Sequence, residues 1–179
     1  SIAAVPGWPV LSHSDLDAML REIALEKQWQ DFSAERDLDF AYGLPGTARF
    51  RANYFWQQNG MAAVFRIIPE TILTLTDLKL PPVIEKLAHL EQGLVLVTGP
   101  TGSGKSTTLA AIINEINQRY AKHIITIEDP IEFVHQSKKC LVTQRQVGLH
   151  TRSFKNALRA ALREDPDVIL VGEMRDLET

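Results

Sequence analysis

The chain has 179 residues, of which 45% are hydrophobic and 23% charged, a balance typical of a folded globular protein and unlike that of a disordered chain. Its formal net charge of −3 argues against a protein that binds nucleic acid through a basic surface. A single cysteine, Cys140, excludes an internal disulfide and a thiolate zinc cluster, and no apolar run is long enough to span a bilayer.

The N-terminal part of the chain is predicted to form a small α+β domain. Four apolar residues recur at helical spacing within 16–23, after Ser14, which is the predicted N-cap. From about residue 37 apolar and polar residues alternate instead, which predicts strands over 38–42, 48–56 and 61–68, separated by two turns. This pattern is typical of an antiparallel meander with one face in water.

The composition changes along the middle of the chain. Residues 71–82 mix polar and apolar side chains around a Pro–Pro pair, which predicts a linker followed by a short helix over 83–91. Beyond it, strands and helices alternate, and this order predicts a parallel sheet covered by helices. The expected elements are strands at 94–98, 123–127, 140–147 and 168–171 and helices at 105–119 and 151–163. The strand at 94–98 is apolar without alternation, so we expect it to be buried on both faces.

The sequence Gly99-Pro100-Thr101-Gly102-Ser103-Gly104-Lys105-Ser106 matches the phosphate-binding motif G-x-x-x-x-G-K-[ST] in full. Glycines let backbone N–H groups approach a phosphate chain, and the following helix adds its positive N-terminal end. Lys105 is predicted to contact the β- and γ-phosphates of a nucleotide, and the Ser106 hydroxyl to bind Mg²⁺. The predicted nucleotide-binding residues are these eight and Thr107. A glycine-rich turn without a ligand is the alternative interpretation.

Two acidic stretches follow predicted strands. In 126–132, TIEDPIE, carboxylates at the end of a strand can orient an attacking water or hold a metal ion, although a solvated acidic turn has the same sequence. In 165–173, DPDVILVGE, four apolar residues precede the acid Glu173, as in a Walker B strand whose acid acts on Mg²⁺. Here a glycine intervenes and the acid is Glu rather than Asp, so a buried strand that ends in an exposed acid is the alternative.

Arg49, Arg51 and Arg66 lie on two neighbouring predicted strands. Such a cluster can stabilise the charge on a transferring phosphoryl group, as an arginine finger does. The alternative is the solvated face of an antiparallel sheet.

The stretches GPTGSGKS, TIEDPIE and LREDPDVILVGEMRD, in this order and spacing, resemble the type II/type IV secretion ATPases, and within them the pilus-retraction branch. The resemblance covers nearly the whole chain. It implies a RecA-like P-loop ATPase core over 83–179, preceded by a linker over 69–82 and a small α+β PAS-like domain over 1–68. It also implies that the first domain is partial and that a His box and a C-terminal region lie beyond Thr179.

The resemblance further implies roles for single residues. Glu132 would be the general base or water-orienting group, Glu173 the Walker B acid acting on Mg²⁺, and Arg51 and Arg66 would reach the γ-phosphate. The implied activity is Mg²⁺-dependent ATP hydrolysis by a homohexamer at the cytoplasmic face of the inner membrane. It would be peripheral to the membrane, bind no nucleic acid and act on the pilus platform protein to retract the pilus.

Other functions stay open at this stage. Pilus-extension and type II secretion ATPases of the same family are the nearest alternatives. A RecA-like DNA motor would need a basic groove or stacking aromatic residues. A nucleotide-binding module without turnover would lack the catalytic acid, and a metabolic P-loop kinase would need an acceptor-binding lid.

Overall fold

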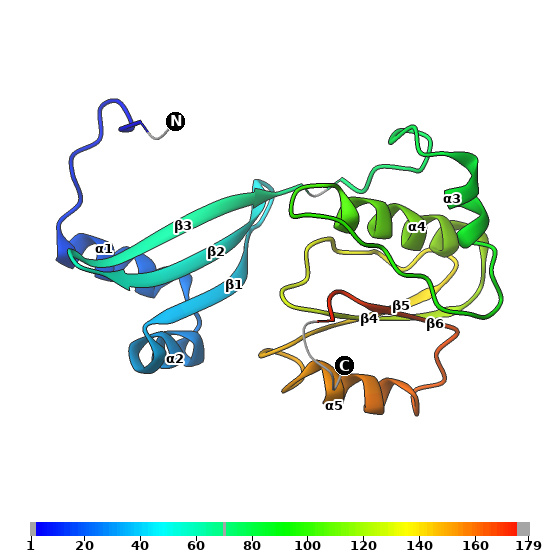
Figure 1. Cartoon of the computed structure of the whole chain (residues 1–179). Helices are drawn as coiled ribbons and strands as arrows, with labels where there is room; N and C mark the ends of the chain where they lie inside the picture. Colours follow the sequence, from blue (N-terminus) through cyan, green and yellow to red (C-terminus); the bar gives the residue numbers. More distant parts are fainter. Residues whose placement is uncertain (1–2, 70, 175–179) are drawn as a thin grey trace. The chain divides into compact units, whose positions relative to one another are not determined.

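The computed structural model describes residues 3–69 and 71–174, and the chain divides into two compact units, Ser1–Ile67 and Ile68–Thr179. The first unit contains α1 (His13–Ile23), α2 (Glu26–Glu35), β1 (Asp37–Leu44), β2 (Ala48–Gln57) and β3 (Gly60–Ile68), of which only Ile68 falls in the second unit (Figure 1). The second contains α3 (Pro82–Leu87), α4 (Lys105–Arg119), β4 (His123–Glu128), β5 (Leu141–Gln146), α5 (Phe154–Ala161) and β6 (Val168–Val171). Within the described ranges, every helix is too short or too polar to cross a membrane.

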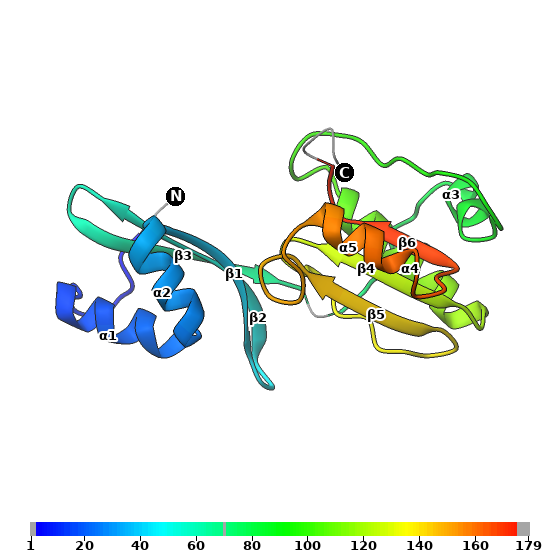
Figure 2. The same cartoon turned by 90° about the horizontal axis from the view of Figure 1, so that it is seen from below.

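The first unit is a three-stranded sheet in the order β1-β2-β3, with α1 and α2 on one face (Figures 1 and 2). β1 and β2 are antiparallel, and the even-numbered residues of both point into a core that includes Leu20, Phe32 and Tyr54. The Tyr54 hydroxyl donates a hydrogen bond to the Leu20 carbonyl (3.2 Å), and burial raises the pKa of Tyr54 to about 12. The predicted meander is confirmed.

The N-cap of α1 is Ser12, so the prediction of Ser14 was wrong. The Ser12 hydroxyl accepts a hydrogen bond from the Asp15 N–H, and the Asp15 carboxylate accepts one from the Ser12 N–H. This reciprocal pair is a capping box, and it satisfies two backbone donors at the start of the helix. Ser14 itself lies in the first turn of α1.

Helix α2 was missed by the sequence analysis. It is polar on average and buries only two large side chains, Trp29 and Phe32, so it shows little helical periodicity. Its start is fixed by the Gln28 side chain, which accepts a hydrogen bond from the Leu25 N–H (2.9 Å). It ends at Glu35, and its C-cap Arg36 adopts the left-handed conformation (φ 64°).

The second unit is a parallel sheet in the order β5-β4-β6, with α3 and α4 on one face and α5 on the other (Figures 1 and 2). Along the central strand β4, Ile124 packs with α4, whereas Ile125 and Ile127 pack with α5. Because side chains alternate along a strand, Thr126 and Glu128 are on the α4 side. The predicted layered α/β arrangement is confirmed.

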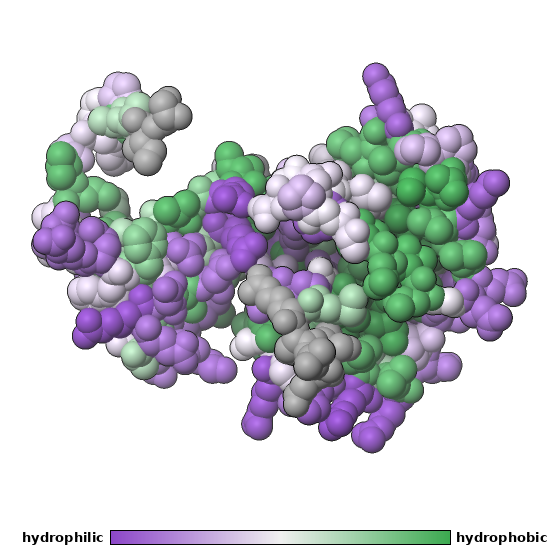
Figure 3. All heavy atoms as spheres, viewed as in Figure 1, coloured by the Kyte–Doolittle hydropathy of each residue, from purple (hydrophilic) through white to green (hydrophobic). Residues whose placement is uncertain are grey.

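The expectation of a buried strand at 94–98 was wrong. Within the described residues this segment forms no strand, and Leu94 and Leu96 are 82% and 58% exposed. Figure 3 shows apolar side chains over the segment that joins α3 to α4. A strand needs a hydrogen-bonded neighbour. In the described sheet β5 and β6 each pair only with β4, and the segment at 94–98 pairs with neither of these edge strands.

The predicted linker contributes to the core of the second unit. Leu75 is buried in the cluster formed with α3 and α4, and Leu78 and Leu80 pack against the same cluster. Thr74 and Asp77 close a turn through hydrogen bonds in both directions, which holds these leucines in place. The segment 71–81 thus joins the second unit although it contains no helix or strand.

Candidate nucleotide-binding and hydrolysis site

The glycine-rich loop leads directly into α4, which begins at Lys105 as predicted. The backbone of the loop is left-handed at three glycines, with φ values of 153° at Gly99, 79° at Gly102 and 89° at Gly104. Residues other than glycine rarely adopt such angles. A Cβ atom at Gly99 would also lie 2.8 Å from the Ser103 hydroxyl. The loop therefore needs glycine at these positions for its own backbone path.

Lys105 extends over the glycine-rich loop. Its Nζ donates hydrogen bonds to the carbonyl oxygens of Gly99 and Pro100, both at 2.8 Å. Among the described residues, no side chain caps the N-terminus of α4, so the first amides of the helix are left for another acceptor. A cation and a helix N-terminus at one place form a binding site for an anion such as phosphate. Ser106 is exposed in the first turn, and Thr107 is half-buried.

The acidic residues follow the carboxyl ends of parallel strands, which meet at one edge of the sheet. Glu128 ends β4, and its Oε1 accepts hydrogen bonds from the Thr126 hydroxyl (2.6 Å) and from the Gln144 amide (3.2 Å). Burial raises the pKa of Glu128, partly opposed by these bonds. A carboxyl group with such surroundings is common at functional sites.

Gly172, between β6 and Glu173, lies close against the end of β4. Its N–H donates to the Ile127 carbonyl (2.8 Å), and a Cβ atom there would stand 3.3 Å from that oxygen and 3.4 Å from the Cα of Glu128. The glycine that interrupts the Walker B pattern thus allows β6 to continue tightly beside β4. It brings the half-buried Glu173 to the same sheet edge as Glu128.

The loop over 129–139, which we call the acidic loop, carries Glu132. Its residues alternate: Ile131, Phe133 and His135 are buried, whereas Glu132 is exposed. The Glu132 N–H donates to Oε2 of Glu128 (3.4 Å), so the structure brings these two acids together. From the sequence, both acids were predicted to lie at the end of the same strand.

The side chains that hold the acidic loop were missed by the sequence analysis. Asn117 of α4 donates to the Gln136 carbonyl (2.8 Å) and accepts from the Lys138 N–H (3.0 Å), and Asn114 accepts from the Lys138 ammonium group (2.7 Å). Gln144 and Gln146 of β5 bind the loop from the other side. The sequence did contain a signal for these contacts, because polar residues stand where apolar ones would be expected on one face of an element. The asparagines are three positions apart in a helix, and the glutamines are two positions apart in a strand.

The three arginines belong to the first unit. By strand alternation Arg49, Arg51 and Arg66 lie on the face opposite the core, as the sequence predicts. Arg51 forms an ion pair with Asp39 of β1, through Nε at 3.1 Å from both carboxylate oxygens and through Nη2. The approach of Arg51 and Arg66 to a γ-phosphate stays a prediction, because the P-loop belongs to the second unit.

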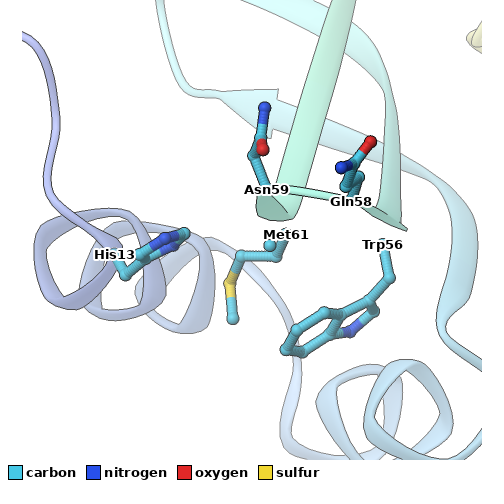
Figure 4. A pocket seen from close by; sticks show the side chains of 6 residues that line it. His13, Trp56, Gln58, Asn59 and Met61 are labelled. Carbon is cyan, nitrogen blue, oxygen red and sulfur yellow. The ribbon is translucent and has the colours of Figure 1, made fainter.

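A shallow hollow in the first unit is separate from these residues. It lies between the start of α1 and the β2–β3 turn and has a volume of about 490 Å³ (Figure 4). It is lined by His13, Trp56, Gln58, Asn59, Gly60 and Met61. None of the predicted site residues lines it.

Comparison with known proteins identifies the family. Residues 37–179 match the model for "Type II/IV secretion system protein", and the chain belongs to this family. It is 56% identical over 171 residues, 96% of its length, to the type IV pilus retraction ATPase PilT of Pseudomonas aeruginosa and to a twitching motility protein of Neisseria gonorrhoeae. It covers 50% and 46% of these relatives, so it spans about half their length.

A solved structure with the same fold is the pilus retraction motor PilT with bound ADP. The TM-score is 0.88 at 53% sequence identity, over 92% of this chain and 48% of that one. The family that the motifs predict is therefore confirmed, and so is the α/β ATPase fold.

Proposed function

We propose that the chain forms the nucleotide-binding part of an ATPase that hydrolyses ATP with Mg²⁺. The observation that carries this proposal is the glycine-rich loop, whose backbone path needs its glycines and whose Lys105 lies at the uncapped N-terminus of α4. The bound ADP in the related PilT structure supports the same ligand class.

In this proposal the loop amides bind the phosphate chain, and Lys105 exchanges its two carbonyl partners for the β- and γ-phosphate oxygens. Glu132, exposed at the sheet edge, orients the attacking water and accepts its proton. Arg51 and Arg66 stabilise the charge that develops on the γ-phosphate. Arg51 first has to leave its ion pair with Asp39.

The residues fit a magnesium ion that is shared with the nucleotide. Ser106 and Glu173 offer hard oxygen ligands, which Mg²⁺ prefers. The described residues contain no group of three or more His, Cys, Asp or Glu side chains that could enclose a metal. Mg²⁺ keeps waters and phosphate oxygens among its ligands and so needs few protein side chains. When bound, the ion would neutralise charge on the β- and γ-phosphates.

We further propose that the enzyme is a homohexameric motor of type IV pilus retraction. It would act at the cytoplasmic face of the inner membrane on the pilus platform protein. The names of the two relatives that are 56% identical, one a retraction ATPase and one a twitching motility protein, support the retraction branch. A deletion strain tests the branch: loss of a retraction motor should leave pili on the cell but abolish twitching, whereas loss of an extension motor should remove the pili.

The role of Glu132 is tested by Glu132→Gln in the full-length ATPase. A base acts mainly in the transition state, so we expect nucleotide affinity within a few-fold of wild type and a kcat lower by roughly 10²–10⁴-fold. Glu91→Gln, which changes an exposed glutamate just before the apolar segment at 94–98, is the matched control. A large loss of nucleotide affinity with little change in kcat would identify Glu132 as a structural acid.

A further inference from the structure

The acidic loop has the burial pattern of a strand but lies outside the sheet. Buried Ile131, Phe133 and His135 alternate with exposed residues, and Glu132 is one of the exposed ones. In a sheet, backbone groups of such a segment would pair with a neighbouring backbone. Here the side chains of Glu128, Gln144 and Gln146 provide these hydrogen bonds instead of a neighbouring strand.

Gln144 of β5 holds the loop on the C-terminal side of Glu132. Its Oε1 accepts a hydrogen bond from the His135 N–H at 2.7 Å, and its Nε2 donates to the Phe133 carbonyl at 2.8 Å. One side-chain amide therefore binds both a backbone donor and a backbone acceptor, as a neighbouring strand would. The bond lengths are those of well-formed hydrogen bonds.

Two further side chains hold the loop on the N-terminal side of Glu132. Oε1 of buried Gln146 accepts from the Ile131 N–H (3.3 Å), and Oε2 of Glu128 accepts from the Glu132 N–H (3.4 Å). Both of these hydrogen bonds are longer than those that Gln144 makes with the loop. Gln144 is connected to the Glu128 bond, because its Nε2 also donates to Oε1 of Glu128 (3.2 Å). Gln144 therefore bonds the loop backbone directly on the C-terminal side of Glu132 and is linked through Glu128 to the Glu132 N–H.

We infer that Gln144 is a positioning residue for hydrolysis. Its side-chain amide fixes the backbone at Phe133 and His135 and also holds Glu128, which accepts from the Glu132 N–H, and so sets where the Glu132 carboxylate meets the attacking water. The inference rests on the proposed role of Glu132. A catalytic group displaced by about 1 Å can lower the rate on the order of 10²-fold, so small shifts of this loop matter. The glycine-rich loop is held by its own contacts, so nucleotide binding should not depend on Gln144.

The test compares Gln144→Met with Thr143→Val in the full-length ATPase. Methionine keeps the volume of glutamine but neither donates nor accepts strongly, whereas Thr143, on the neighbouring position of β5, bonds His123 at the opposite end of the sheet. We expect Gln144→Met to lower kcat roughly 10–100-fold with the dissociation constant for ADP within about three-fold of wild type. Thr143→Val should change neither quantity by more than about two-fold.

Hydrogen exchange supplies a second measurement that does not depend on turnover. In Gln144→Met the backbone amide of His135 loses its acceptor and should exchange at least ten-fold faster, while the amides of α4 keep their wild-type rates. If Gln144→Met does not fold, Gln144→Glu serves instead, because it keeps an acceptor for the His135 N–H but loses the donor to Phe133 and Glu128.

The outcomes separate this inference from the proposed function. Loss of turnover in Glu132→Gln together with wild-type kcat in the Gln144 variants would overturn the positioning role and leave the ATPase proposal standing. Equal losses of kcat and ADP affinity in Gln144→Met would also overturn it, since Gln144 would then support the whole site. Normal turnover in Glu132→Gln would overturn the role of Glu132 and the positioning role with it.

Discussion

Two loops carry the proposed chemistry, and they are held in place in different ways. The glycine-rich loop is fixed from within: its glycines permit its backbone path, and Lys105 binds the carbonyls of Gly99 and Pro100 a few positions earlier. The acidic loop is fixed from outside, by Asn117 of α4 on one side and Gln144 of β5 on the other. A locally fixed loop tolerates changes elsewhere in the fold, whereas an externally fixed loop moves when the helix or the sheet moves.

The largest effect is expected from Lys105→Ala, which removes the only side chain shown to span the glycine-rich loop among the described residues. The lysine supplies a positive charge to the β- and γ-phosphates, so ATP turnover in the full-length enzyme should fall at least about 10³-fold. Steady-state phosphate release measures this. Lys139→Ala, which removes an exposed lysine of the acidic loop, should keep most of the activity, and normal turnover in Lys105→Ala would refute the P-loop assignment.

The next largest effect is expected from Gly99→Ala, which tests whether the glycine-rich loop is held in shape by its own residues. Gly99→Ala introduces a Cβ atom 2.8 Å from the Ser103 hydroxyl at a φ of 153°, so the loop has to change shape. Nucleotide affinity should fall roughly 10–100-fold, because converging amides bind phosphate only in the right geometry. Titration with a fluorescent nucleotide measures the affinity.

Gly46→Ala is the matched control for Gly99→Ala. Gly46 also has a positive φ (72°), but nothing lies within 4 Å of the added Cβ. It should cost about 1 kcal/mol of stability and leave nucleotide affinity unchanged. Equal affinities for both variants would show that the path of the glycine-rich loop does not determine binding.

Asn117→Ala tests the external support of the acidic loop. It leaves the Gln136 carbonyl and the Lys138 N–H without their partner where both bonds are partly buried, so the free energy of unfolding of the second unit should fall by about 2 kcal/mol. Urea unfolding measures the loss. Asn156→Ala on the exposed side of α5 should change the free energy by less than about 0.5 kcal/mol, and a similar loss in both would mean that Asn117 is no anchor.

The smallest effect concerns pH and His135, which is buried in the acidic loop. Burial, with a smaller contribution from Lys138, lowers the pKa of His135 to about 4, whereas an unfolded chain has a value near 6.5. The unfolded state therefore binds more protons between these values. The stabilisation is complete above about pH 6.5 and is lost as the pH falls toward 4.

We expect wild type to lose about 1–2 kcal/mol more than His135→Leu between pH 7 and pH 4.5. Urea unfolding at several pH values measures the difference. Burial raises the pKa of Glu128, which acts in the opposite direction, and taking the difference between the two proteins removes that contribution. Parallel pH curves for wild type and variant would show that His135 is accessible to protons in the folded state.

Local patterns were predicted well from the sequence, whereas the absence of a pairing partner for the segment at 94–98 was not. The glycine-rich loop and the limits of α4 depend on neighbouring residues, so they could be inferred directly. The runs 94–97 and 168–171 are equally apolar, yet the second forms β6 beside β4 and the first remains exposed. An apolar composition permits a segment to form a strand, but the segment does so only where it can pair with a neighbouring strand. That neighbour is formed by residues far away in the sequence.

The same distinction applies to the candidate site. The stretches with Glu132 and Glu173 could be found because each follows an apolar run, and the family resemblance singled out Glu132 within its stretch. The asparagines and glutamines that hold the acidic loop could not be named, since their partners lie 9 to 24 positions away along the chain. The reason for Gly172 also became visible only with the end of β4 beside it.

The distribution of tryptophan and cysteine gives each unit its own spectroscopic or chemical reporter. The three tryptophans, Trp8, Trp29 and Trp56, all belong to the first unit, whereas the single cysteine belongs to the second. The Cys140 thiol is buried and donates to the Tyr120 carbonyl (2.9 Å) at the end of α4, so a thiol reagent reaches it only when that region opens. Within this chain, indole fluorescence and thiol labelling thus follow the unfolding of the two units separately, without any introduced label.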